Sequence, residues 1–152
     1  MSDDHRHHQI AALPVYVDPA GGLEVYLVTA RGSGRWIIPK GNPIRGRAPH
    51  EVAAQEAIEE AGLVGRIGQH SIGAFEFSKG TGRIETAYLV DVYVLKVERQ
   101  MRKWAEMKER SVLRCNIQTA LTLITSHSLA ALLDHYVSSE IAMPGQSDWV
   151  AS

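Results

Sequence analysis

Residues 41–63 read GNPIRGRAPHEVAAQEAIEEAGL, and the second half of this stretch carries the clearest helix signal in the chain. Strong helix formers run over residues 49–61, with a proline in the first turn and Gly62 at the expected end. Alanines recur on one side of this segment, so that side can pack closely on another element. The sequence therefore predicts a helix over 49–61.

Three carboxylates lie on one side of the predicted helix. At 100° per residue, Glu56, Glu59 and Glu60 fall within an arc of about 100°. Like charges at this spacing destabilise a helix by roughly 0.2 to 0.5 kcal/mol per pair, so a cation is expected nearby. Oxygen ligands of this kind suit Mg²⁺ or Mn²⁺. On spacing alone, a solvated acidic face is the more frequent explanation.

The segment that precedes the helix favours a binding site over a solvated face. Glycines such as Gly41 allow the backbone to approach a ligand closely. Basic residues also crowd this stretch beside the acidic helix, which is the combination that a phosphate and a metal ion require. For any one of them the alternative is an ordinary surface position. The candidates are Arg31, Arg35, Lys40, Arg45 and Arg47.

The rest of the chain alternates between strand and helix patterns, which predicts an α/β fold with a mixed sheet between helices. Two β-rich runs separated by DPAGG are expected to form a hairpin, and two apolar-faced segments near the C-terminus are expected to be helices. The predicted strands are 9–17, 23–28, 36–38, 73–77 and 86–97, with a charged loop at 78–83, and the predicted C-terminal helices are 116–124 and 128–139.

Composition narrows the possible partners. The 152 residues carry a formal net charge of −1, so no basic field favours nucleic acid, and no apolar run is long enough to suggest a membrane partner. The single cysteine, Cys115, rules out an intramolecular disulfide. The lone cysteine favours a reducing, cytoplasmic setting, and the basic residues beside the acidic helix favour a small phosphorylated substrate. The sequence makes no prediction about the oligomeric state.

One domain is expected, because the length fits one core and no linker interrupts the chain. Residues 9–140 are assigned to it. Residues 1–8 are polar and rich in histidine, so they are expected to be a disordered tail, with metal binding as the less favoured alternative. Residues 141–152 are expected to be a C-terminal tail.

Residues 41–63 resemble the Nudix box, in which a glycine, a glutamate, an Arg-Glu pair, a Glu-Glu pair and a final glycine recur at fixed spacing. The glycines and the three helix glutamates of this chain fall on their pattern positions. The resemblance extends through RWIIPKG before the box and, more weakly, to the C-terminal helices. It implies a Nudix-type α/β/α sandwich with a mixed β-sheet and a catalytic loop-helix-loop.

Two positions depart from that pattern. Arg47 stands where the box has a glutamate, and Gln55 stands where it has an arginine. In the family these two side chains are thought to support the loop and orient the helix. Because both partners are replaced, no buried charge is left alone. The chain is interpreted as an active member with altered support, and a catalytically impaired module that binds nucleotide or polyphosphate ligands remains the alternative.

The resemblance also implies roles for individual residues. Mg²⁺ or Mn²⁺ would be held chiefly by Glu56 and Glu60, and Glu59 would act as the general base or as a further ligand. Acidic ligands from beyond the sheet are common in the family, and Glu106 and Glu109 are the candidates here, although a solvated helix face is the more frequent explanation for each. The predicted substrate-binding residues are Arg31, Arg35, Lys40, Gly41 and Arg47.

The predicted activity is hydrolysis of a phosphoanhydride bond. WIIPKG and the following loop resemble the branch that contains diphosphoinositol polyphosphate and diadenosine polyphosphate hydrolases. The basic cluster suits either substrate, whereas an adenine would also call for an aromatic shelf. Aromatic residues in strands are more often part of the core, but several could form such a shelf. They are Tyr16, Tyr26, Tyr88, Tyr93 and Trp104.

Overall fold

The computed structural model describes residues 7–81, 84–142 and 149–151. Helix α1 (Pro49–Ala61) has the predicted bounds. The Glu51 carboxylate accepts a hydrogen bond from the backbone N–H of Ala48 at 2.9 Å, which satisfies one of the free donors at the helix start. Gly62 ends the helix with φ of 68°, a left-handed conformation that glycine adopts without strain.

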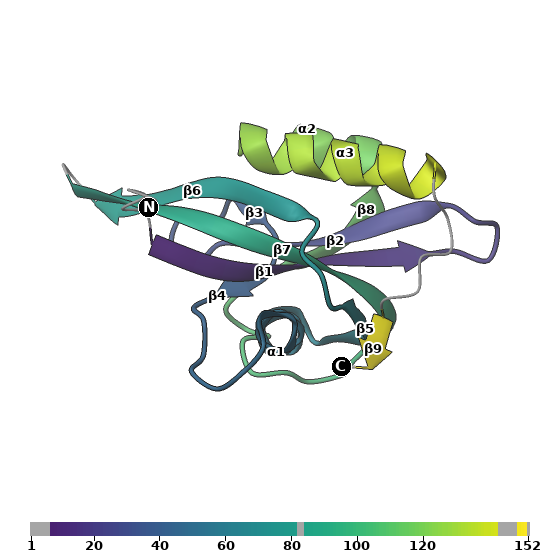
Figure 1. Cartoon of the computed structure of the whole chain (residues 1–152), viewed down its shortest axis with the longest axis horizontal. Helices are drawn as coiled ribbons and strands as arrows, with labels where there is room; N and C mark the ends of the chain where they lie inside the picture. The colour runs from purple at the N-terminus through teal and green to yellow at the C-terminus, as the bar shows by residue number, and fades with distance from the viewer. Residues whose placement is uncertain (1–6, 82–83, 143–148, 152) are drawn as a thin grey trace.

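A mixed sheet separates α1 from the two C-terminal helices (Figure 1). Its main path runs β3-β2-β1-β7-β5-β9, while β4 pairs with β1, β6 with β7 and β8 with β2. Strands β1 and β7 are parallel, and the other named pairs are antiparallel. The strands are β1 (His7–Val17), β2 (Leu23–Thr29), β3 (Trp36–Ile37), β4 (Lys40–Gly41), β5 (Leu63–Gly68), β6 (Gly73–Thr81), β7 (Ile84–Gln100), β8 (Val112–Asn116) and β9 (Trp149–Ala151).

The first two strands form the predicted hairpin. The carboxylate of Asp18 accepts hydrogen bonds from the backbone N–H groups of Ala20 at 2.8 Å and Gly22 at 2.9 Å, which closes the turn locally. Val17 pairs with Leu23 directly beside the turn. The DPAGG segment therefore acts as the turn that its composition predicts.

Small residues bring α1 close to the sheet. Ala53, Ala57 and Ala61 are fully buried beneath it. On the opposite face, α2 (Ile117–Leu123) and α3 (His127–Ala142) cover the sheet, and Leu129 and Leu133 of α3 are almost fully buried. The predicted α/β/α sandwich with a mixed sheet is confirmed.

Several strands were not predicted. β5, β8 and β9 are short, and each is held in the sheet by a partner that is distant in sequence. The predicted loop at 78–83 was also wrong in part, because Ser78 to Thr81 pair with β7 as the end of β6. Backbone pairing in a hairpin does not require apolar side chains, so a charged glycine-containing segment can continue a strand.

The predicted tail boundaries need correction. β1 begins at His7, which pairs with Tyr88, and residues 149–151 form β9 against β5. The remaining tail residues, 1–6, 143–148 and 152, lie outside the described part of the chain. Within the described part, no helix combines the length and apolar character needed to cross a membrane.

Candidate active site

Glu60 lies under the sheet at the inner side of α1. It is 4% exposed and is the one charged residue among the described residues that is buried. Its Oε1 accepts a hydrogen bond from the backbone N–H of Lys40 at 3.3 Å, and its Oε2 lies 3.6 Å from Nη2 of Arg110. A buried carboxylate requires such partners. α1, β4 and the segment before β8 thus meet at Glu60.

Glu56 lies one helical turn before Glu60, and the two carboxyl groups share a hydrogen bond. Gly41 faces Glu56 so closely that a Cβ atom at position 41 would collide with the Glu56 carboxylate. Gly41 was predicted to let a ligand approach the backbone; here the absence of its side chain makes room for Glu56. The prediction of a direct substrate contact stays a prediction.

Burial perturbs the titration of this group of residues. It raises the pKa of Glu60 from 4.5 to about 8; Arg110 opposes this shift, and the hydrogen bond that protonated Glu60 donates to the Glu56 carboxylate acts in the same direction as burial. Burial also raises the pKa of Glu56. Burial lowers the pKa of Lys40 from 10.5 to about 8, while Glu60 opposes that shift. Burial therefore disfavours the ionised form of each of these three side chains.

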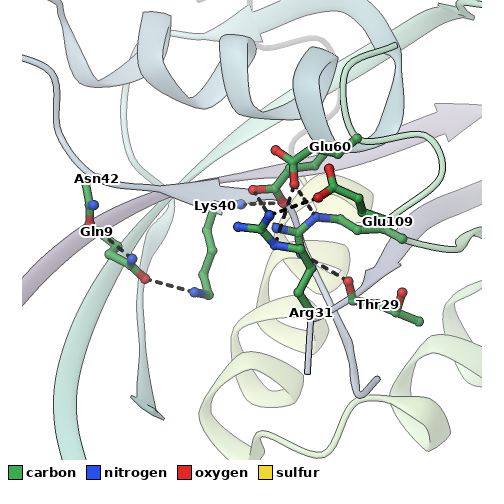
Figure 2. A network of polar contacts seen from close by, with 9 residues as sticks. Gln9, Thr29, Arg31, Lys40, Asn42, Glu60 and Glu109 are labelled. Atoms are coloured by element: carbon green, nitrogen blue, oxygen red, sulfur yellow. Dashed lines mark hydrogen bonds and ion pairs between the residues drawn. The ribbon is translucent and has the colours of Figure 1, made fainter. Parts of the chain in front are cut away.

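Arg110 joins α1, the turn at 105–109 and the end of β2 in one polar network. Figure 2 shows a polar network in which Glu60, Thr29, Arg31 and Glu109 are labelled. Nε of Arg110 lies 2.9 Å from Oε1 of Glu106, and its Nη1 donates to the backbone oxygen of Thr29 at 3.1 Å. Arg31 continues the network outward, with Nη1 3.3 Å from Oε1 of Glu109. Sequence reasoning did not select Arg110, although its position four residues after Glu106 is a spacing that favours an ion pair.

The side chain of Glu59 has different partners from the side chain of Glu60. Its Oε1 accepts a hydrogen bond from Nε2 of Gln55 at 2.9 Å, and Oε1 of Gln55 in turn accepts one from Arg47. The two residues that depart from the Nudix pattern are therefore in direct contact. Glu59 remains within electrostatic reach of Glu56.

The predicted basic residues do not form one cluster. Lys40 donates from Nζ to Oε1 of Gln9 at 2.9 Å, and its Nζ lies 3.9 Å from the centre of the Phe77 ring. Arg31 pairs with Glu109, and Arg47 contacts Gln55. Arg35 and Arg45 are exposed. Their predicted contacts with substrate phosphate stay predictions.

Glu106 and Glu109, the two candidate ligands beyond the sheet, lie in a turn at 105–109 and not on a helix face. The side chain of Glu106 is 20% exposed and that of Glu109 is 48% exposed. The backbone N–H of Glu106 donates to the backbone oxygen of Glu59 at 2.9 Å, which fixes the turn against α1. Glu106 is thus the one that lies close to Glu56 and Glu60.

The donor set fits a hard divalent cation. Glu56, Glu60 and the nearby Glu106 offer carboxylate oxygens, the ligands that Mg²⁺ and Mn²⁺ prefer, and burial disfavours the ionised forms of the first two, which a bound cation would favour. Side chains are not preassembled for a metal, since in the described ranges no three His, Cys, Asp or Glu residues are grouped tightly enough to hold one.

A hollow of about 490 Å³ lies on the outer side of α1. Arg47, Gln55 and Glu59 line it together with the apolar side chains of Ile67 and Val150. Neither Glu56 nor Glu60 reaches it. The helix therefore separates this hollow from the carboxylates of Glu56 and Glu60.

Comparison with known proteins places the chain near one family. No family model matches it. Nudix hydrolase 12, mitochondrial, of Arabidopsis thaliana is 28% identical over 125 residues, covering 80% of this chain and 62% of that protein. Nudix hydrolase 13, mitochondrial, of the same plant is 24% identical over 127 residues, covering 80% and 63%. The chain thus spans less than two thirds of the length of these curated relatives.

Solved structures agree on the fold. An Ap4A hydrolase from C. elegans, in a binary complex, superposes with a TM-score of 0.66 at 15% identity, covering 90% of this chain and 99% of that one. A NUDIX hydrolase from Nitrosomonas europaea gives a TM-score of 0.66 at 13% identity, covering 88% and 90%. The chain has the Nudix fold, and the resemblance predicted from residues 41–63 is confirmed.

Proposed function

We propose that this chain is a Nudix hydrolase that uses a divalent cation to cleave a phosphoanhydride bond in a small phosphorylated substrate. The observation that carries the proposal is the Glu56–Glu60 pair, two hydrogen-bonded carboxyl groups at the inner side of the Nudix-fold helix. Glu60 is buried, Glu56 is half-buried, and Arg110 faces only Glu60 of the two; two adjacent carboxylates beside one cation are costly, so such a pair is expected to serve a ligand.

Glu56 and Glu60 would hold Mg²⁺ or Mn²⁺, with Glu106 as a further oxygen donor. When bound, the cation supplies charge stabilisation at the phosphoanhydride oxygens and lowers the pKa of a coordinated water. The residues of the chain do the rest. Lys40 would neutralise phosphate charge, and Glu59, once it has left its Gln55 partner, would accept a proton from the attacking water.

Aromatic residues next to Lys40 favour a dinucleoside polyphosphate over an inositol pyrophosphate. The Tyr88 ring lies 6.1 Å from Phe77 and 5.6 Å from His7, and all three are on neighbouring strands. Aromatic surfaces suit a nucleobase and have little use for a highly charged inositol ring. Tyr88 is therefore our candidate for the shelf. Trp104 is not, because its ring is packed against Gly62.

A ligand-binding module without hydrolysis is the second candidate. Its support is that Glu59 is tied to Gln55, and that Arg47 and Gln55 replace the charged pair of the Nudix pattern. A base held in this way would have to leave its partner to reach a water. Binding without turnover would favour this candidate.

The test is a substrate screen with the purified protein. Diadenosine polyphosphates, nucleoside diphosphate derivatives and inositol pyrophosphates are incubated with Mg²⁺ or Mn²⁺, and the products are separated by chromatography. We expect cation-dependent turnover that chelation stops, with the highest kcat/KM on a dinucleoside polyphosphate. Tight binding with no product would refute the hydrolase and leave the binding module.

Location in the cell is a separate proposal. We propose a cytoplasmic enzyme, on the basis of the lone cysteine. The names of some relatives include the words mitochondrial or chloroplastic. Imaging of the tagged chain in cells would therefore decide the location.

A further inference from the structure

The three arms of the Arg110 guanidinium contact three separate parts of the fold. Nη2 faces Glu60 on α1 at 3.6 Å, Nε binds Glu106 in the turn at 2.9 Å, and Nη1 donates to the Thr29 backbone oxygen at the end of β2 at 3.1 Å. The side chain is only 10% exposed. Charge pairs that are shielded from water in this way are screened little by salt.

Burying the Glu60 carboxylate costs free energy, and this cost explains why the Arg110 guanidinium lies beside it. Removing one partner from a buried ion pair leaves an uncompensated charge, which is far more destabilising than losing a surface pair. Lys40 gives Glu60 a backbone N–H, whereas the Lys40 ammonium is directed to Gln9 and Phe77. Arg110 is therefore the side chain that compensates Glu60 directly.

We propose that Arg110 is a positioning residue of this site, a built-in counter-ion that holds Glu60 and Glu106 in place until a divalent cation takes over their compensation. The charge that the Nudix pattern puts at position 55 on the helix is absent here, because that residue is Gln55. Arg110 brings a positive charge to the same helix from a different element. The second half of this inference rests on the cation site of the proposed function.

Arg110 and the divalent cation should each reduce the stabilisation that the other gives. Both compensate the same carboxylates, so each should weaken the need for the other, and the coupling between them must be reciprocal. Lysine could supply the charge, but a single ammonium cannot bind Glu60, Glu106 and the Thr29 oxygen in the planar arrangement that a guanidinium allows. Charge and geometry can therefore be tested separately.

The experiment compares Arg110→Gln and Arg110→Lys with the wild-type chain. Arg114→Gln is the matched control. The Arg114 side chain is 47% exposed, and its Nε lies 3.5 Å from Oε1 of Glu24, which is not part of the candidate site. Thermal unfolding is followed with a chelator and again with saturating Mg²⁺ or Mn²⁺. Isothermal titration measures the affinity for each ion without any substrate.

Without metal, Arg110→Gln should lower the Tm by about 5 to 10 °C, Arg110→Lys by less, and the control by no more than about 2 °C. Saturating ion should remove at least half of the deficit of Arg110→Gln. By linkage, that variant must also bind the ion more tightly than the wild type, by about threefold or more.

A Tm deficit of equal size with and without ion would overturn the inference, because Arg110 would then be a structural contact alone. So would weaker ion binding by Arg110→Gln, or the absence of any deficit in the metal-free state. The proposed function is judged from the wild type: if neither ion binds it, the cation site fails, whatever the variants do.

Discussion

Glu59 and Glu60 are consecutive in the chain, yet they lie in contrasting surroundings on the two sides of α1. Glu60 is buried and is bound by the Lys40 backbone and by Arg110. Glu59 is half-buried and is held by Gln55 beside the outer hollow. The three glutamates of α1 therefore do not form one uniform acidic face, although a helical projection places them on one arc.

The difference between the two sides is how charge is compensated. On the inner side, an arginine from a distant segment faces the carboxylate directly. On the outer side, Arg47 reaches Glu59 through the amide of Gln55, so the contact is polar and indirect. We infer that the inner side serves the cation and that the outer side sets the orientation of Glu59.

Replacing each glutamate separately should give the largest effects. Glu60→Gln removes a charge that the ion needs, so it should abolish detectable Mg²⁺ binding and lower kcat/KM by about 100-fold or more. Glu59→Gln should lower kcat by about 100-fold while ion affinity changes little, because its carboxylate is turned away. Titration calorimetry and steady-state kinetics separate the two. Equal loss of ion affinity in both variants would show that the division is wrong.

Gly41→Ala tests the inner side through the position of Glu56. The added methyl group would collide with the Glu56 carboxylate, which must then rotate away. We expect kcat/KM and ion affinity to fall by about 10- to 100-fold. The Tm should change little, since the end of a flexible side chain moves and the backbone does not. An unchanged ion affinity would argue that Glu56 is not a ligand.

The pH dependence of stability tests the inner side in the metal-free protein. The pKa of Glu60 is raised to about 8, so its contribution to stability is complete below pH 4.5 and is lost as the pH rises towards 8. The pKa of Lys40 is lowered to about 8, so its contribution is complete above pH 10.5 and is lost as the pH falls towards 8. Their combined contribution is lowest near pH 8.

Urea unfolding from pH 5 to 10 in the presence of a chelator measures this effect. The free energy of unfolding of the wild type, relative to Glu60→Gln, should fall by on the order of 2 kcal/mol between pH 5 and 8. Relative to Lys40→Met it should rise above pH 8. Parallel curves for wild type and Glu60→Gln would mean that Glu60 has an ordinary pKa.

The smallest effect is expected on the outer side. Arg47→Glu alone adds negative charge near the glutamates, and combining it with Gln55→Arg supplies a cation in return. Because the two side chains touch, a double-mutant cycle on kcat/KM should show a favourable coupling of about 1 kcal/mol. Additive effects would mean that this contact does not influence Glu59, and that Arg47 acts on substrate phosphate.

Local signals were enough to predict α1 and the first hairpin, but not β4 or the turn at 105–109, which also surround the site. Helix α1 begins at Pro49 and ends before Gly62, as predicted, and the Asp18 turn closes the predicted hairpin. The difference between Glu59 and Glu60 could not be predicted in the same way. A helical projection places both on one arc, but only the packing of β4 and the turn at 105–109 decides which one is buried.

Arg110 illustrates the same limit. Its contact with Glu60 joins residues about 50 positions apart, and no local pattern reports a pairing over that distance. β8, which follows directly, is five residues long and pairs with the distant β2. The aromatic shelf stays a proposal: Tyr88 was a candidate from the sequence, whereas the rings that lie beside it, Phe77 and His7, were not.

The parallel pairing of β1 and β7 has a consequence for how the chain folds. Residues of β1 find their partners about 80 positions later in the sequence, so the centre of the sheet cannot close until β7 has been synthesised. Until then the hairpin of β1 and β2 carries an unpaired apolar strand edge, which is open to association with other chains. We therefore expect refolding to be slow for a domain of this size, and aggregation during it to rise steeply with protein concentration.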